Sequence, residues 1–110
     1  MAQPLQAGTN DLKKLDAKLK SMKIQYHDKD TKFEHKDVKE IEKRGQNPEY
    51  TKNIRSGNCV DCAVVVSAEA RKLGLKAEYR FENHHVVTIV YDRMGAGYRY
   101  SNCKRTGWGQ

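Results

Sequence analysis

The stretch SGNCVDCAVVVSAEARKLGLKAE, residues 56–78, decides the fold prediction. Its valine run could form a strand, but the following SAEARKL and Gly74 are typical of the end of a helix. We therefore predict one helix from about Cys59 to Leu73. Because apolar side chains surround most of its first half, we expect this helix to be buried at the centre of the domain.

Three segments after this helix have the pattern of strands: residues 76–82, 85–92 and 98–102. DRMGAG, residues 92–97, predicts a hairpin turn between the last two of them. Helices followed by an antiparallel meander indicate an α+β fold, with N-terminal helices and a central helix packed on a small antiparallel sheet. The 110 residues fit a single domain, with a lysine-rich helical part (1–50) and a core (51–110).

The N-terminal half predicts two exposed helices. The first begins between residues 9 and 11 and ends near Met22, because apolar side chains recur at steps of three and four. The second covers residues 31–44 and ends at Gly45. Residues 45–58, with Pro48 and Gly57, are expected to form a loop. The apolar positions that carry these predictions are Leu12, Leu15, Leu19 and Met22 in the first helix and Phe33, Val38 and Ile41 in the second.

The formal net charge is +7, and acidic residues are interleaved with the lysines, as on a solvated helix face. We expect weak polyanion binding through non-specific phosphate contacts, and the sequence has no nucleic-acid recognition motif. Residues 1–20 lack the apolar segment of a secretory signal, and no apolar run is long enough to span a membrane. These features predict a cytoplasmic protein without membrane contact. The three cysteines, an odd number, then predict reduced thiols and no disulfide.

Cys59 is the candidate nucleophile. At a helix start it lies beside unpaired backbone N–H groups and the positive end of the helix dipole, which lower a thiol pKa. Asn58 or Ser56 is the expected cap, and Asp61 is expected in a structural role in the first turn. The same N–H groups would stabilise the oxyanion that forms when a thiolate attacks a carbonyl.

A thiolate nucleophile needs a histidine and often a third side chain that orients the ring. His84 and His85 begin one predicted strand, and Asn102 ends the next. Neighbouring strand residues point to opposite faces, so only one of the two histidines can face Cys59. The residues alone predict a set of Cys59, one of these histidines and Asn102.

Three other interpretations of the cysteines remain open. Cys59 could be a buried structural thiol, and Cys62 is expected to serve packing. Cys-x-x-Cys is also a zinc half-site, which Cys59, Cys62, His84 and Cys103 could complete, although a second paired motif is missing and a valine-rich helix follows at once. A thioredoxin-like redox pair lacks the preceding βαβ pattern. We expect no metal and no cofactor.

The segment from residue 50 to 103 resembles the transglutaminase-like, papain-related superfamily of cysteine peptidases. Its Gly-x-Cys-x-Asp opening and Ala-Arg-x-x-Gly ending resemble the nucleophile helix of that superfamily. KNIRSGNCVD (52–61), HVVTIVY (85–91) and YRYSN (98–102) are similar to segments of the pseudomurein endoisopeptidases of archaeal viruses.

The resemblance implies a papain-like core with Cys59 as nucleophile, His85 as base and Asn102 at the position of the family's aspartate. Asn58, Asp61 and His84 would support them. It also implies a virus or mobile-element origin, a peptide or isopeptide substrate, and either hydrolysis or acyl transfer.

Two departures from the family pattern support an alternative function. Val87 stands where the family has tryptophan, and Asn102 where it has aspartate. Such changes are typical of an active site in partial decay. The alternative is an inactive papain-like fold that binds a protein or a nucleic acid, for example as a viral inhibitor, and the third hypothesis is a small zinc-binding module.

Overall fold

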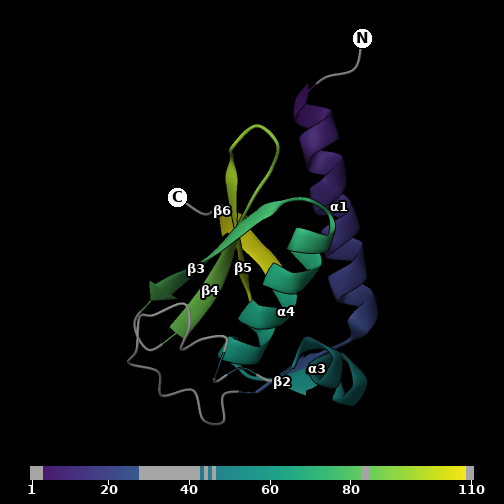
Figure 1. Ribbon diagram of the computed structural model, residues 1–110, viewed down its shortest axis with the longest axis vertical. Coiled ribbons are helices and arrows are strands. Elements are labelled where there is room, and N and C mark those ends of the chain that lie inside the picture. Colours follow the sequence, from purple (N-terminus) through teal and green to yellow (C-terminus); the bar gives the residue numbers. More distant parts are fainter. Residues whose placement is uncertain (1–3, 28–42, 44, 46, 83–84, 109–110) are drawn as a thin grey trace.

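Helix α4 (Cys59–Lys72) crosses one face of an antiparallel sheet (Figure 1). The computed structural model describes residues 4–27, 43, 45, 47–82 and 85–108. The predicted α+β class, with a central helix on a small antiparallel sheet, is confirmed. The other elements are α1 (Pro4–Met22), β1 (Gln25–Tyr26), α3 (Pro48–Ile54), β2 (Ser56–Gly57), β3 (Lys76–Glu82), β4 (His85–Tyr91), β5 (Gly97–Ser101) and β6 (Lys104–Trp108).

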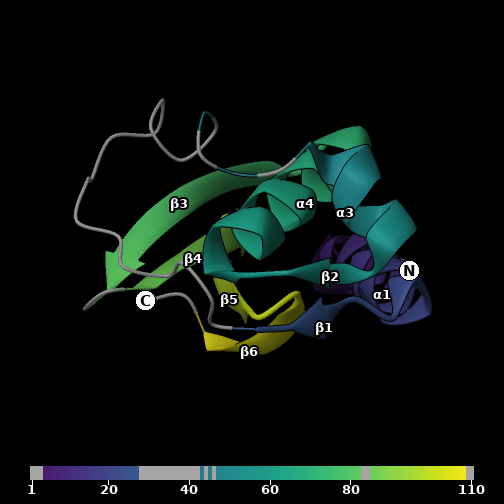
Figure 2. The same ribbon diagram turned by 90° about the horizontal axis from the view of Figure 1, so that it is seen from below.

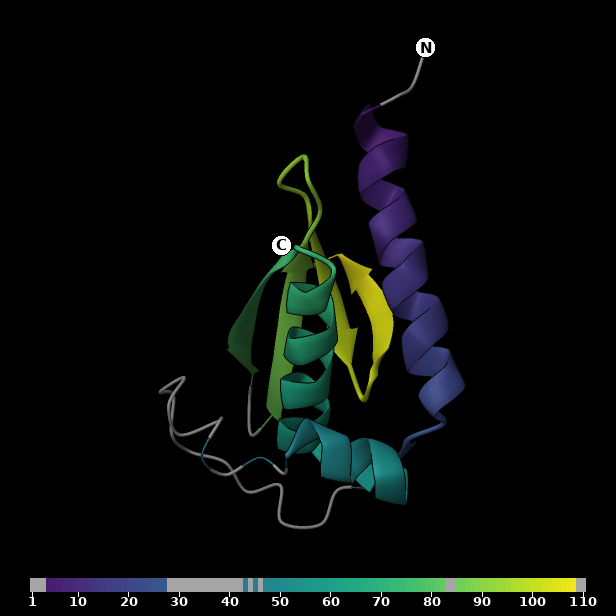
Figure 3. The ribbon, with the colours of Figure 1, turned by 45° about the vertical axis from the view of Figure 1, so that its right-hand side comes forward.

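The bounds of α4 follow from its sequence. Asn58 caps its start, and Gly74, at a φ of +79°, follows its end in the left-handed conformation that glycine adopts most easily. The helix is buried on most of its surface because it packs on one face of the sheet and also contacts α1, which runs along the β6 edge (Figure 3). The predicted helix from about Cys59 to Leu73 is therefore confirmed.

The sheet has the strand order β3-β4-β5-β6, all antiparallel. Val86, Thr88 and Val90 of β4 face α4: Val86 packs in a cluster with Cys59, Val90 packs with Val65, and Thr88 donates a hydrogen bond to the Ala63 carbonyl at 3.0 Å. The predicted strands match β3, β4 and β5 to within one residue at each end. No strand was predicted over β6, which pairs with β5.

Helix α1 is longer than the predicted helix and begins at Pro4. Leu12, Leu15 and Leu19 are buried against Val66 of α4 and Tyr100 of β5. The Tyr100 hydroxyl donates a hydrogen bond to the Asp16 carboxylate at 2.6 Å, which ties α1 to the sheet. None of the described helices is long and apolar enough to cross a membrane.

The predicted loop over residues 45–58 is wrong, because it contains α3 and β2. The Asn47 side chain accepts a hydrogen bond from the Glu49 N–H, and Pro48 occupies the first helical position, where a missing N–H costs nothing. Strand β2 then pairs in parallel with β1 beside the start of α4 (Figure 2). The predicted helix over residues 31–44 lies outside the described residues, apart from Lys43.

Candidate functional site

Cys59 is the first residue of α4, and a reciprocal cap fixes the backbone around it. The Asn58 Oδ1 accepts hydrogen bonds from the N–H groups of Val60 and Asp61, both at 3.1 Å. In return, the Asp61 carboxylate accepts one from the Asn58 N–H at 3.1 Å. This capping box leaves the cysteine at a rigid helix start.

Gly57 allows the chain to pass close to this cap. A Cβ at residue 57 would lie 2.8 Å from the Asp61 Cβ and 3.2 Å from the Thr51 Cγ2. Real Cβ atoms do not approach that closely, so a side chain at residue 57 would push the segment away from Asp61. Glycine is therefore part of the architecture that places Cys59.

The thiol of Cys59 is buried, with 1% of the residue exposed. Burial raises its pKa, while the backbone N–H groups of Val86 and Val60 lower it to a smaller extent. The helix start was expected to lower the pKa of Cys59, but burial outweighs this effect. An ionised sulfur loses more stabilisation by water than these N–H groups supply. At neutral pH the buried thiol is protonated.

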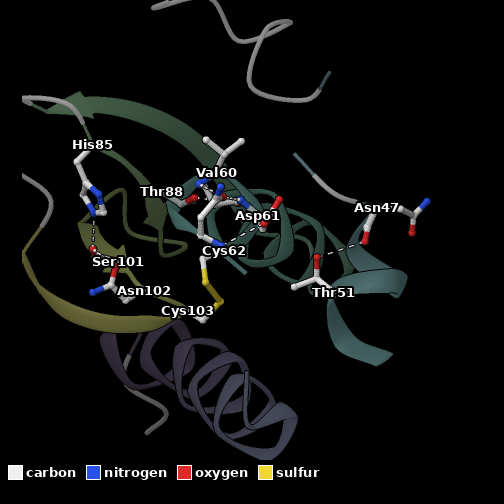
Figure 4. Close-up of a disulfide and its surroundings, with 12 residues drawn as sticks. Asn47, Thr51, Val60, Asp61, Cys62, His85, Thr88, Ser101, Asn102 and Cys103 are labelled. Atoms are coloured by element: carbon white, nitrogen blue, oxygen red, sulfur yellow. Dashed lines mark hydrogen bonds between the residues drawn. A yellow bond between two sulfur atoms is a disulfide. The ribbon is translucent and has the colours of Figure 1, made fainter. Parts of the chain in front are cut away.

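Cys62 and Cys103 form a disulfide, 41 residues apart in the sequence (Figure 4). The prediction of three reduced thiols is therefore wrong, and Cys59 is the free cysteine. An odd number of cysteines excludes full pairing but still allows one bridge, which only the fold shows. The bridge joins the first turn of α4 to the β5–β6 turn, where Asn102 and Cys103 both have positive φ.

This disulfide overturns two of the alternatives. Cys62 and Cys103 cannot serve as thiolate zinc ligands while they are bonded to each other, and His84 lies outside the described residues. Among the residues that the structure describes, no three histidine, cysteine or acidic side chains could hold a metal ion. Cys62 also does not pair with Cys59, as a thioredoxin-like couple would require.

His85 begins β4 and is connected to Asn102 through Ser101 (Figure 4). The His85 Nε2 lies 2.8 Å from the Ser101 Oγ, and the Ser101 Oγ donates to the Asn102 Oδ1 at 3.4 Å. If the Ser101 hydroxyl gives its proton to Asn102, it accepts from the ring, and the tautomer with the proton on Nε2 is favoured. The lone pair of the neutral ring is then on Nδ1.

Burial also lowers the pKa of His85. The Glu82 carboxylate, opposite His85 in the β3–β4 register, raises it, and the Arg99 guanidinium lowers it. Glu82 and Arg99 form an ion pair, with the Arg99 Nε 2.9 Å from the Glu82 Oε2. The ring is therefore held neutral at neutral pH.

Val86 lies between the two halves of the predicted triad. Its N–H stabilises the Cys59 anion, and its side chain packs in the Cys59 cluster. Since neighbouring strand residues point to opposite faces, the His85 side chain leaves β4 on the other side, with Glu82 and Ser101. Neither a hydrogen bond nor an ion pair joins Cys59 to His85 in the described part of the chain.

The structure thus connects His85 with Asn102 and places Cys59 beside the residue that follows His85. The link through Ser101 was missed from the sequence, because the orienting contact was expected to run directly from Asn102. A signal was available: Ser101 immediately precedes Asn102 and ends a strand that neighbours the strand of His85.

Comparison of the chain with protein-family models, with curated proteins and with solved structures finds no match in any of the three. The family resemblance therefore rests on the motif residues alone.

Proposed function

We propose that the chain is a thiol-dependent peptidase or isopeptidase, or an amide acyl transferase, with Cys59 as the nucleophile. One observation carries the proposal: the free thiol lies at a capped helix start, where the backbone N–H groups of Val86, Val60 and Cys59 itself act to lower its pKa. The residue before Val86 is His85, whose ring is linked through Ser101 to Asn102. The residue types and their roles are those that acyl transfer needs.

The reaction begins when the Nδ1 of His85 takes the thiol proton of Cys59. The thiolate attacks the carbonyl carbon of an amide and forms a C–S bond, while the N–H of Cys59, which does not donate to the Asn58 side chain, stabilises the oxyanion. The imidazolium then gives its proton to the leaving amine as the C–N bond breaks. Water or a second amine attacks the resulting thioester and releases Cys59.

Substrate binding has a conformational requirement in this mechanism. A carbonyl must reach a thiol that is 1% exposed, and the start of β4 must rearrange to bring the His85 side chain from the opposite face of the sheet to Cys59. In the described conformation the reaction therefore cannot begin. Binding of a peptide at the α4 start would have to open the site.

The burial of Cys59 supports a second candidate function, a papain-like fold that binds a macromolecule without catalysis. A protonated, covered thiol with no bond to His85 is also what a former active site would retain. The Val87 and Asn102 departures fit the same candidate.

Trapping of an acyl-enzyme distinguishes the two candidates. A mixed pool of peptides and lysine-linked isopeptides is incubated with the protein in hydroxylamine, and mass spectrometry detects new termini and hydroxamates. The proposal predicts hydroxamates that depend on Cys59 and are lost in Cys59→Ser. If wild type and Cys59→Ser leave the pool equally unchanged, the catalytic proposal fails and the binding candidate remains.

A further inference from the structure

A pocket of about 540 Å³ lies between the end of α1 and the β5–β6 turn. Helix α1 runs alongside β6 in Figure 3, and the two elements are in contact. A cavity of this volume can hold several atoms of a ligand side chain or a short stretch of peptide. Asn102 and Cys103 form part of its wall, so the pocket adjoins the site described above without including Cys59 or His85.

The charged wall of the pocket is mostly cationic. Lys20 and Lys23 come from the last turn of α1 and the residue just beyond it, and Lys104 and Arg105 come from the start of β6. Lysines near a helix C-terminus complement the helix dipole, which accounts for the first two without a ligand. That explanation does not extend to Lys104, which lies on a strand.

Asp16 is the carboxylate in the wall, and it already has partners. The Arg105 guanidinium lies 2.8 Å from its Oδ2, and the Tyr100 hydroxyl donates to its Oδ1 at 2.6 Å. Lys20, Lys23 and Lys104 are exposed and have no ion-pair partner among the described residues. Three ammonium groups around one pocket therefore remain available to an anion.

Part of the remaining wall is apolar, beside the polar side chain of Asn102. Leu19 is buried, Ile24 is half-buried and both border the same space. Among the described residues of the wall, none has an aromatic side chain on which a nucleotide base could stack, although stacking is a large part of single-stranded nucleic-acid binding. Cations above an apolar floor fit a peptide that alternates carboxylates with apolar side chains.

We infer that this pocket is a binding site for an acidic peptide segment. Carboxylates of the peptide contact Lys20, Lys23 and Lys104, and an apolar side chain rests on Leu19 and Ile24. The inference does not require Cys59 to be catalytic. If Cys59 is catalytic, the peptide would pass Asn102 on its way to the α4 start, and the pocket would select acidic sequences near the scissile bond.

Fluorescence anisotropy with a fluorescein-labelled hexapeptide of alternating glutamate and leucine tests the inference. The pocket variant is Lys20→Gln with Lys23→Gln and Lys104→Gln. The matched variant is Lys13→Gln with Lys14→Gln and Lys76→Gln, which removes the same charge from exposed positions outside the pocket. Both are compared with wild type at near-physiological salt, where general attraction is screened within about 8 Å. Thermal unfolding shows whether each variant remains folded.

We expect the pocket variant to bind at least about fivefold more weakly than the matched variant, since even exposed ion pairs add up when three converge on one ligand. A peptide with glutamine in place of glutamate should not bind wild type. Equal weakening in both variants would overturn the inference and leave only general electrostatics. It would also be overturned if a short oligouridylate bound more tightly than the peptide and lost its binding in the pocket variant. Peptide binding by Cys59→Ser should equal wild type, so failure of the catalytic proposal and failure of the pocket are separate outcomes.

Discussion

The His85 Nε2 lies 2.8 Å from the Ser101 Oγ and so ties the start of β4 to the end of β5. The proposed base directly precedes Val86, whose N–H is beside the Cys59 thiol. The bond also places the ring one hydroxyl away from Asn102. The orientation and charge of the His85 ring therefore depend on its neighbours in β3 and β5. This dependence can be measured through the pKa of the ring and through the pH dependence of stability.

The pKa of His85 is expected below its usual value of 6.5 because the ring is partly buried. NMR titration of the ring carbons checks this in wild type and two variants. Glu82→Gln should lower the pKa further, since it removes the carboxylate that favours the charged ring. Arg99→Gln should raise it, since it removes the opposing cation. Shifts of the same sign in both variants would contradict the described electrostatics.

The same shift makes stability depend on pH with a defined sign. A folded pKa below the unfolded one means that the unfolded chain binds the proton first as pH falls. The contribution of His85 is therefore present above about pH 6.5 and is lost below it. His85→Ala should reduce the fall in unfolding free energy in this pH range, as measured by urea titration at several pH values.

Cys59 is expected to react slowly with iodoacetamide in the folded chain, because the thiol is buried and its pKa is raised. Peptide mass spectrometry at neutral pH should show alkylation at least about tenfold slower than in concentrated urea, since the thiolate is the reactive form and access is required. Cys59→Ser gives the background. Equal rates with and without urea would mean that the thiol is open to solvent.

The Cys62–Cys103 bridge should contribute to stability by restricting the unfolded chain. Its 41-residue separation corresponds to a contribution of about 2–4 kcal/mol. Urea unfolding with and without a phosphine reductant measures this value in wild type. In the double variant Cys62→Ala with Cys103→Ala, the urea midpoint of unfolding should be lower than in oxidised wild type, and the reductant should not change it. If the reductant leaves the wild-type midpoint unchanged, the bridge is absent in solution.

Glu69 of α4 is expected to hold three elements together. Its side chain is 0% exposed and lies within 2.7–3.3 Å of the amines of Lys18 from α1, Lys52 from α3 and Lys72 from its own helix. Burial alone would raise the pKa of Glu69, but the hydrogen bonds from these lysines lower it to about 2. Glu69→Gln should lower the free energy of unfolding by about 1–3 kcal/mol at neutral pH, less than for a fully enclosed pair because two of the lysines reach solvent.

The pH dependence provides a control for Glu69. Its folded pKa lies below the unfolded value of 4.5, so its contribution should be lost as pH falls from about 4.5 toward 2. In Glu69→Gln, the free energy of unfolding should depend less on pH over this range. Glu49→Gln removes an exposed carboxylate from the same lysines and should change stability much less. Equal effects of the two variants would contradict a central role for Glu69.

The sequence predicts α4 and β3 to β5 well because local signals and tertiary contacts agree there. The start of α4 has an asparagine cap and its end has a glycine, and β4 is a continuous apolar run whose central residues are all buried. Strand β6 was missed because KRTGW is short and polar, and only its pairing with β5 makes it a strand. Helix α3 was missed because Pro48 was taken as a loop residue rather than as the first residue of a helix.

The sequence proposes candidate residues for the site but not their contacts. Cys59, His85 and Asn102 follow from motif and position, whereas the Cys62–Cys103 bridge needs two segments 41 residues apart to meet at a Cα separation of 4.9 Å. The raised pKa of Cys59 also depends on what packs over the helix start. The residues next to Cys59 in the sequence do not indicate which distant side chains pack over the helix start.

The most direct test of the catalytic account is the rate at which p-nitrophenyl acetate acetylates Cys59 at neutral pH, followed by peptide mass spectrometry. The account predicts acetylation of Cys59 in wild type, no acetylation at residue 59 in Cys59→Ser, and a rate at least about 100-fold lower in His85→Ala, as for loss of a general base. Equal Cys59 acetylation in wild type and His85→Ala would contradict the account, and so would acetylation confined to lysines.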